Sequence, residues 1–208
     1  MNYIPLIFAV AGIHMLAAIS PGPDFIMVIK NSLTHSRKAG IWTAVGFGLG
    51  IGIHVLYCLA GIALIISQSI VLFNTIKLLG AGYLVYIGVR SFMSKSKELD
   101  VEVEKTSNTM SAWGGVRSGF LTNILNPKAS LFFFGLFTLM IPASTPSYVL
   151  GIIGIIVIVQ TMLWFSFVAT ILTHKKIRSV FEKYQNIFNK TFGGLLIALG
   201  LKVALSKR

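Results

Sequence analysis

Long apolar runs alternate with short polar connections along the whole chain. Crossing about 30 Å of hydrocarbon takes roughly 20 apolar residues in a helix. On this basis we place six spans, at residues 4–29, 40–66, 70–92, 118–141, 146–172 and 187–206. The second and fifth are the clearest, because no Asp, Glu, Lys or Arg occurs at 39–76 or at 129–174. The pattern predicts an all-α integral membrane protein with six transmembrane helices.

Prolines beside a charged residue interrupt the first and the fourth of these spans. Asp24 directly follows one interruption and Lys128 follows the other. The helix-breaking residues are Pro21, Gly22, Pro23 and Pro127. Because proline removes a backbone donor and clashes with the preceding turn, we expect both spans to be broken helices. A charge and freed backbone groups are both costly in lipid, so their combination is typical of a transport path.

A polar segment divides the chain in two. Residues 94–112 are rich in Ser and Lys and hold four of the six acidic residues. We interpret this segment as a cytoplasmic linker between a first half at 1–93 and a second half at 113–208. Each half holds three predicted spans, an odd number, so the halves enter the membrane in opposite directions. This is the organisation of two inverted three-helix repeats.

Two sequence matches favour such a repeat. A Gly-x5-Gly-x-basic pattern begins at Gly82 in the third span and recurs at Gly194 in the sixth, 112 residues later. The Pro–charge pairs that end at Asp24 and Lys128 lie 104 residues apart. Two matches in the same order with similar offsets indicate an internal duplication.

Basic residues collect on one side of the predicted spans. The connections after spans one, three and five hold thirteen Lys and Arg, whereas the opposite side holds four. Cytoplasmic loops carry such an excess, so we place these connections in the cytoplasm and both termini outside. The net charge of +12 is explained in the same way, and nucleic acid is not expected as a partner.

Two further segments show helical spacing. Gly46 with Gly50, and Gly48 with Gly52, form two small-residue faces on the second span, which pack helices of one molecule together or build a homo-oligomer. In residues 174–190, apolar side chains recur on one face and basic side chains occupy the others. This pattern predicts a separate helix lying in the membrane interface.

The chain lacks the motifs of the common enzyme classes. There is no nucleophile elbow, phosphate-binding loop or zinc helix, and Cys58 is the single cysteine. The four histidines have no metal-ligand spacing. Paired acid–base catalysis is also excluded, because Asp24 is the only carboxylate in a predicted span. We therefore expect no enzyme activity, no bound cofactor and no metal site.

A zwitterion needs both signs of charge within a few ångströms. Asp24 would bind an ammonium group, while Lys128 and the amides of Asn123 and Asn126 would bind a carboxylate. These four residues are the predicted substrate and proton-coupling site. One alternative is that Asp24 and Lys128 only pair with each other and staple the two halves. The histidines at 14 and 54 either relay protons or are packed side chains.

The proline motif at 20–24, the glycine-rich second span and the segment Asn123–Ala129 together resemble the LysE/RhtB family of amino-acid exporters. The resemblance covers the whole chain. It implies secondary export of amino acids or close derivatives from the bacterial cytoplasm, driven by the proton gradient, with the amino acid, protons and membrane lipid as partners. Members differ in substrate. A metal-cation exporter of the same superfamily and a non-transporting membrane scaffold are the alternatives.

Overall fold

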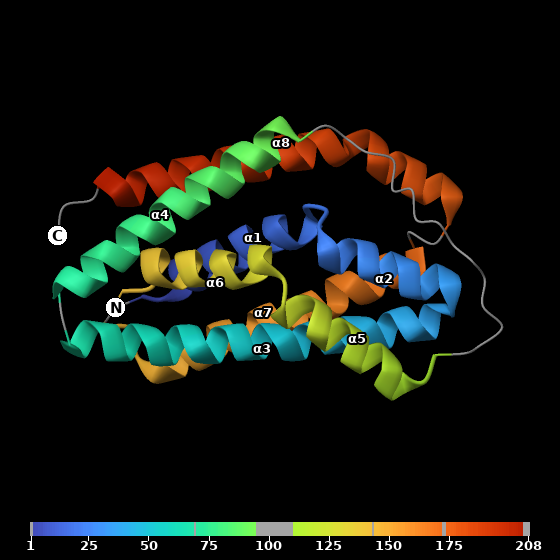
Figure 1. Ribbon diagram of the computed structural model, residues 1–208, viewed down its shortest axis with the longest axis horizontal. Coiled ribbons are helices and arrows are strands. Elements are labelled where there is room, and N and C mark those ends of the chain that lie inside the picture. Colours follow the sequence, from blue (N-terminus) through green and yellow to red (C-terminus); the bar gives the residue numbers. More distant parts are fainter. Residues whose placement is uncertain (1, 69, 95–109, 143, 172–173, 206–208) are drawn as a thin grey trace.

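The computed structural model describes residues 2–68, 70–94, 110–142, 144–171 and 174–205. Throughout these ranges the ordered elements are helices, which run roughly along one long axis (Figure 1). They are α1 (Ile4–Ile19), α2 (Pro23–Thr34), α3 (Arg37–Gln68), α4 (Ile70–Met93), α5 (Ala112–Ile124), α6 (Pro127–Met140), α7 (Ser147–Ile171) and α8 (Lys175–Leu205). The predicted all-α class is confirmed. Residues 95–109 of the predicted linker lie outside the described residues.

The first and fourth predicted spans are each divided into two helices. Residues 20–22 separate α1 from α2, which meet at an angle of 57°. Residues 125–126 separate α5 from α6. Both α2 and α6 begin with a proline, a position where the missing N–H would have had no helical partner. In the structure, one helix thus ends and the next begins near Pro21–Pro23 and again near Pro127.

The outer surface of the bundle is apolar. By length and composition, α7 and the Arg37–Ala60 part of α3 can each cross a membrane, and α1 with α2 form a third candidate when counted as one bent span. Large apolar side chains that are more than half exposed include Phe8, Leu56, Leu79, Ile155 and Leu163. Such a surface suits lipid rather than water. The count of six spans stays a prediction.

Glycines bring α3 and α5 into backbone contact. A Cβ added at Gly46 would collide with the carbonyl of Val116, and one added at Gly119 would collide with the carbonyl of Thr43. The other face of α3 packs on α7, where Gly48 faces Met162. Both predicted small-residue faces thus contact helices of the same molecule. A homo-oligomer stays a prediction.

The pair α4 and α8 shows a regular set of close contacts. Gly88 approaches the carbonyl of Gly193 and the backbone of Ile197, whereas Gly200 approaches the carbonyl of Ala81 and the backbone of Val85. The helices are therefore antiparallel. The two contacts are related by an offset of 112 residues. Adding 112 to Gly88, Ala81 and Val85 of α4 gives the positions of Gly200, Gly193 and Ile197 of α8. The 112-residue offset found in the sequence thus also relates these contacts.

Replacing Gly193 with alanine should destabilise the protein. The new Cβ would lie 2.5 Å from the carbonyl oxygen of Gly88 and 2.6 Å from the backbone nitrogen of Phe92, so the two helices must separate. Overpacking of this kind costs about 1–3 kcal/mol. We expect the melting temperature of the purified protein to fall by several degrees, as followed by circular dichroism.

The neighbouring Gly194 provides the matched control. A Cβ added there meets nothing within 4 Å. Gly194→Ala should leave the melting temperature unchanged or raise it slightly, because alanine favours helix by about 0.5–1 kcal/mol over glycine. Equal melting temperatures for the two variants would contradict the close α4–α8 contact.

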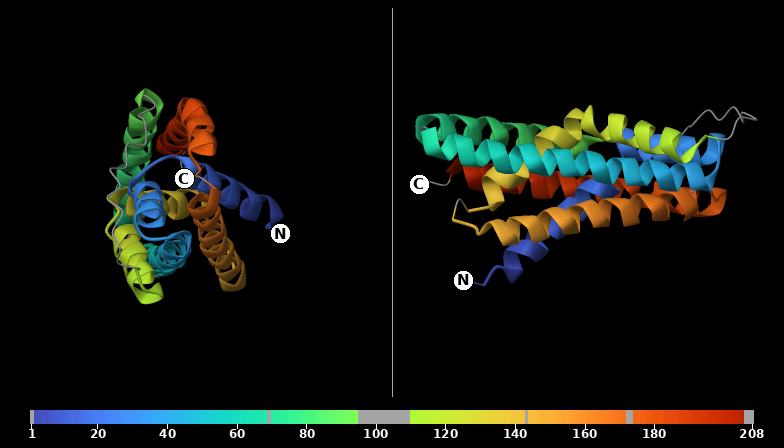
Figure 2. Two further views of the ribbon diagram at one scale, coloured as in Figure 1. Left: turned by 90° about the vertical axis from the view of Figure 1, so that its right-hand side faces the viewer. Right: turned by 90° about the horizontal axis from the view of Figure 1, so that it is seen from below.

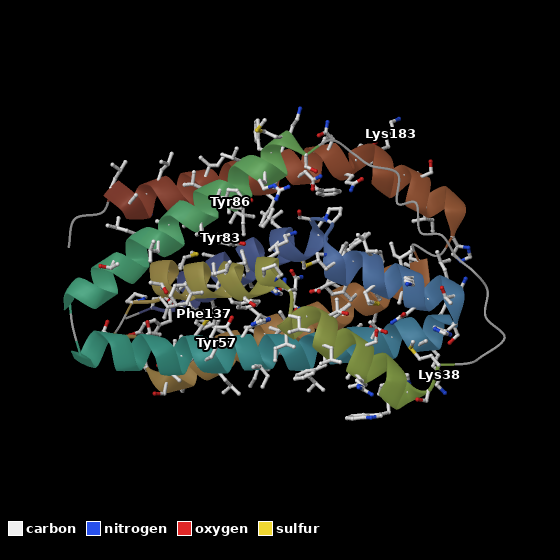
Figure 3. All side chains as sticks on the ribbon, in the orientation of Figure 1. Lys38, Tyr57, Tyr83, Tyr86, Phe137 and Lys183 are labelled. Atoms are coloured by element: carbon white, nitrogen blue, oxygen red, sulfur yellow. The ribbon has the colours of Figure 1, made fainter. Side chains whose placement is uncertain are left out.

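The helix ends group at the two ends of the bundle. In Figures 1 and 2, α1 and α4 begin and α3 and α8 end at one end of the bundle. The end of α2 and the starts of α3 and α8 lie at the other end, toward which Lys38 and Lys183 are placed (Figure 3). Which end faces the cytoplasm stays a prediction.

One local prediction is wrong. Instead of a separate interfacial helix over 174–190, α8 runs without a break from Lys175 to Leu205. The reason is a continuous buried face: Gln185 and Asn189 point inward at helical spacing with Phe192 and Leu196. The sequence pattern had emphasised the apolar side chains of the opposite, exposed face, such as Ile187.

Two apolar core clusters lie on either side of the helix breaks. The larger one joins α1, α3, α4, α6, α7 and α8 and includes Val10, Ile51, Phe137 and Ile153. The smaller one joins α2, α3 and α7 around Phe25, Ala44 and Phe47. Along both α3 and α7 the clusters follow one another, with a short gap between them. Polar side chains concentrate in this gap.

Candidate functional site

The two helix breaks meet at a cavity of about 60 Å³ between the two core clusters. This is room for a few water-sized groups. All four predicted site residues line the cavity, namely Asp24, Asn123, Asn126 and Lys128, and so does Gly22 from the first break. Helices α1, α2, α3, α5, α6 and α7 contribute to its wall. The structure thus brings the four predicted residues to one common point of the fold, and their role in transport stays a prediction.

Asp24 is bound by side-chain amides from the second half of the chain. Its Oδ2 accepts a hydrogen bond of 2.7 Å from Nδ2 of Asn123, and its Oδ1 accepts one of 3.1 Å from Nδ2 of Asn126. Asn126 also caps α6, because its Oδ1 accepts the backbone N–H of Lys128 at 3.0 Å. A carboxylate has about four acceptor sites, so these two donors leave capacity for a further cation.

Lys128 is bound by the break of the first half. Its Nζ donates to the carbonyl oxygen of Ser20 at 3.0 Å and to that of Pro21 at 3.5 Å. Ser20 is the C-cap of α1, so the ammonium sits at the negative end of that helix dipole. It also lies 5.3 Å from the ring centroid of Phe192, within the range of a cation–π contact.

Asp24 and Lys128 do not form a direct ion pair in the described part of the chain. Each binds polar groups at the break of the opposite half instead. The alternative in which Asp24 and Lys128 pair directly with each other is therefore wrong. The physical reason is that each break supplies groups of matching sign: amide donors near α6 for the carboxylate, and free carbonyls at the end of α1 for the ammonium.

A polar wall closes one side of the cavity. His14 of α1 and Thr161 of α7 both line it. Nδ1 of His14 lies 2.9 Å from Oε1 of Gln160, and its Nε2 lies 3.3 Å from Oγ1 of Thr161. Alongside, the indole N–H of Trp164 donates to the carbonyl of Ala18 at 3.1 Å, which holds α7 against α1. His14 was considered from the sequence as either a proton relay or a packed side chain, whereas Thr161 was not singled out.

The remaining wall is apolar and aromatic. Phe132 and Phe133 of α6 meet edge to face, with ring centroids 5.6 Å apart. Further apolar lining comes from Ala17, Ala18, Phe25, Ile51, Ala129 and Phe165. The cavity thus combines one acid, one primary amine and two amides with an apolar wall. This is the composition of a site for a small polar molecule with an aliphatic portion.

His54 of α3 binds backbone groups on both sides of the second break. Its Nε2 lies 3.1 Å from the carbonyl oxygen of Asn123, at the end of α5. Its Nδ1 lies 2.9 Å from the hydroxyl of Tyr57, which donates to the carbonyl of Ser130 in α6 at 3.1 Å. Figure 3 shows Tyr57 beside α3. The histidine is buried but does not line the cavity.

Gly50 of α3 sets the position of the Asn123 amide. A Cβ added at Gly50 would lie 2.5 Å from Oδ1 of Asn123 and 3.0 Å from its Cβ. Gly50→Ala should therefore push the amide away from Asp24 and remove a hydrogen bond to a charged group, which is worth about 1.5–3 kcal/mol. We expect amino-acid transport in reconstituted vesicles to fall at least about tenfold.

Gly52 on the same helix is the control for this prediction. A Cβ added there would meet only the flexible Cδ1 of Ile158, at 3.5 Å, which is ordinary contact. Gly52→Ala should keep most of the transport activity. Equal losses in both variants would show that alanine in α3, rather than the position of Asn123, is responsible.

The described residues contain no cluster of three or more His, Cys, Asp or Glu side chains that could hold a metal ion. The cavity itself offers one carboxylate, one imidazole and amides. Nothing in this wall favours the metal-cation exporter considered above.

Comparison with known proteins identifies the family. A family model described as "LysE type translocator" matches residues 15–207. The membrane protein YrhP of Bacillus subtilis is 33% identical over 99% of this chain and 98% of its own. The threonine efflux protein of Escherichia coli is 27% identical, with 97% of this chain and 98% of its own covered. The homoserine/homoserine lactone efflux protein of Salmonella typhimurium is 25% identical, with 92% of each chain covered.

No solved structure gives a significant match to the chain. The family match spans both helix breaks and all four predicted site residues. The family consists of translocators rather than enzymes, in agreement with the absence of an enzyme motif in the sequence. The protein therefore belongs to the LysE family of membrane translocators.

Proposed function

We propose that the protein is a secondary transporter that exports a neutral amino acid from the bacterial cytoplasm in exchange for protons. The observation that carries this proposal is the meeting of two helix breaks at one cavity, with an acid on one and a primary amine on the other. An amino-acid zwitterion requires this pair of charges. The efflux relatives named for threonine and homoserine support the same class of substrate.

The substrate would be held by its two charged ends. Its ammonium group binds the free acceptor sites of Asp24, and its carboxylate binds Nζ of Lys128. The side chain then faces the apolar wall, with Thr161 and His14 as polar partners for a hydroxyl group. Asp24 is the one acid among the described lining residues, so no second acid remains for a basic side chain. This favours short neutral substrates over lysine or arginine.

Substrate binding would loosen the contact between the two halves. Without substrate, Lys128 holds the carbonyls of Ser20 and Pro21, and Asp24 holds the amides of Asn123 and Asn126. A substrate carboxylate competes with those carbonyls for the ammonium of Lys128. A ligand shifts a conformational equilibrium by binding one state better. Here the ligand replaces the links that keep the two breaks together, which permits the two halves to rock.

We further propose that the halves are an inverted repeat. The two α4–α8 contacts, which are related by an offset of 112 residues, support this idea. A two-fold axis between the repeats would exchange α4 with α8 and so turn each contact into the other. The broken helices support it in the same way, since Asp24 and Lys128 each reach the break of the other half. Alternating access in such proteins comes from rocking of one repeat against the other around a central site.

We further propose that the protein lies in the cell (inner) membrane with its basic connections facing the cytoplasm. It exchanges the exported amino acid for external protons. Purified protein in vesicles tests it directly. Vesicles loaded with unlabelled threonine should take up labelled threonine by counterflow, and a pH gradient should drive net movement. The panel then extends to homoserine, serine, valine, leucine, lysine and arginine. Absence of counterflow for every amino acid would refute the transport function and favour the scaffold alternative.

A further inference from the structure

The contacts of His54 need one more hydrogen atom than a neutral imidazole supplies. The chain of contacts has three links: Nε2 to the carbonyl of Asn123, Nδ1 to the hydroxyl of Tyr57, and this hydroxyl to the carbonyl of Ser130. Both ends of the chain are carbonyl oxygens, which only accept. A neutral ring and a tyrosine hydroxyl provide two hydrogens for three links. An imidazolium and the hydroxyl provide three.

We propose that His54 binds the coupling proton, and that the bound proton closes a hydrogen-bonded link across the second helix break. This inference rests on the proposed proton-driven export. Asn123 belongs to α5 and Ser130 to α6, so the link joins the two helices on either side of residues 125–126. Binding adds one proton to a ring nitrogen and makes no other chemical change. When the ring loses this proton, the Tyr57 hydroxyl can donate to Nδ1 of His54 or to the carbonyl of Ser130, but not to both. One link of the chain therefore opens.

The link reaches the substrate site through a single residue. The backbone carbonyl of Asn123 binds His54, while its side-chain amide binds Oδ2 of Asp24 at 2.7 Å. When the link is open, His54 and Tyr57 no longer tie α5 to α6, so the end of α5 can move together with the Asn123 amide that orients the carboxylate. The proton site and the ammonium-binding group are thereby coupled without direct contact.

The surroundings of His54 suit a proton that is bound and released. The ring is buried and stacks on Phe133, with centroids 5.9 Å apart and planes 11° apart. Burial disfavours the imidazolium, whereas the Asn123 carbonyl and the carboxylate of Asp24 on α2 favour it; Lys128 of α6 is turned to the end of α1. His14 of α1 contacts the same Phe133 ring, and Tyr57 and Cys58 are the titratable neighbours on α3. Burial thus favours release of the proton, and the carbonyl and carboxylate favour its binding.

His14 makes a similar pair of contacts but cannot form this link. Its side-chain partners, Gln160 and Thr161, both belong to α7. Neither of them is on α5 or α6. The position of His54 between the two half-helices is what distinguishes it.

The first test observes the proton itself. Purified full-length protein with ¹⁵N-labelled histidine should show one ring, assigned by its loss in His54→Gln, that changes from neutral to doubly protonated between about pH 8 and pH 5. Tyr57→Phe removes the acceptor of Nδ1, so the same change should require a pH lower by about one unit. A His54 ring that stays neutral down to pH 5, or that titrates identically in Tyr57→Phe, would overturn the proposal.

The second test separates coupling from transport in vesicles, with labelled threonine as the first probe. His54→Gln should still show threonine counterflow, which moves no net proton, at a rate lowered by the freed Asn123 amide. Relative to that rate, the variant should lose at least tenfold of the stimulation by a pH gradient. His174→Gln, an exposed position that contacts Arg37, should behave like the wild type. Wild-type stimulation in His54→Gln would overturn the proposal. A wild type without any counterflow would instead refute the export function, and the titration of the labelled ring would still decide the proton site.

Discussion

Asp24→Asn should abolish export. The substitution keeps the size of the side chain but removes the charge that would bind the substrate ammonium. It also turns one amide donor toward Asn123 or Asn126, which are donors themselves. Truncating one partner of a buried, hydrogen-bonded charge pair costs about 2–5 kcal/mol, so we expect counterflow to fall at least about 100-fold. Initial rates of labelled threonine counterflow provide the measurement.

Two controls test whether loss of the Asp24 charge is responsible for the loss of counterflow. Asp100→Asn changes the other aspartate of the chain, in the predicted linker, and should keep wild-type activity. The melting temperature of Asp24→Asn should show that the protein is still folded. Undiminished counterflow in folded Asp24→Asn protein would exclude this carboxylate from the substrate site.

Lys128→Met should have an effect of similar size on export with a small effect on stability. The variant loses the primary amine that would bind the substrate carboxylate, and we expect counterflow to fall about 100-fold. It also removes a buried charge, whose desolvation offsets much of the loss of the hydrogen bonds to Ser20 and Pro21. Counterflow rates and melting temperatures measured on the same preparation test both parts.

An exchange of the two charges separates this interpretation from an ion pair. In Asp24→Lys with Lys128→Asp, the new ammonium would face the amide donors of Asn123 and Asn126, and the new carboxylate would face carbonyls. Both contacts are repulsive, so the double variant should be as inactive as either single variant. Restored export would mean that attraction between the two side chains is their main role.

The sequence could indicate the four candidate site residues because their features are local. Proline directly before a charge inside an apolar run breaks a helix whatever surrounds it. The four polar residues near the two breaks were therefore identified, and the structure places them at one cavity. Close helix contacts were also foreseen from the glycine spacing of α3, because a backbone-to-backbone approach requires a missing side chain.

What the sequence could not supply is the identity of partners that lie far apart in the chain. Nothing in the local pattern indicates that Lys128 binds Ser20 and Pro21 rather than Asp24, or that Asn123 serves two helices at once. Thr161 lies in an unbroken apolar run and has no sequence signal at all. The continuous α8 was missed because inward-facing Gln185 and Asn189 interrupt the apolar pattern that marks a buried helix face.

The exchange of partners between the two breaks has a consequence for assembly in the cell. The ribosome synthesises the first break about 100 residues before Asn123 and Asn126. Until then the Asp24 carboxylate has no amide donors from them, and the carbonyls of Ser20 and Pro21 have no ammonium. Neither break supplies these partners itself, so we expect the contacts of the first break to form only after the second break has been synthesised. Each helix break is in this sense completed by a segment that is made later or earlier in the same chain.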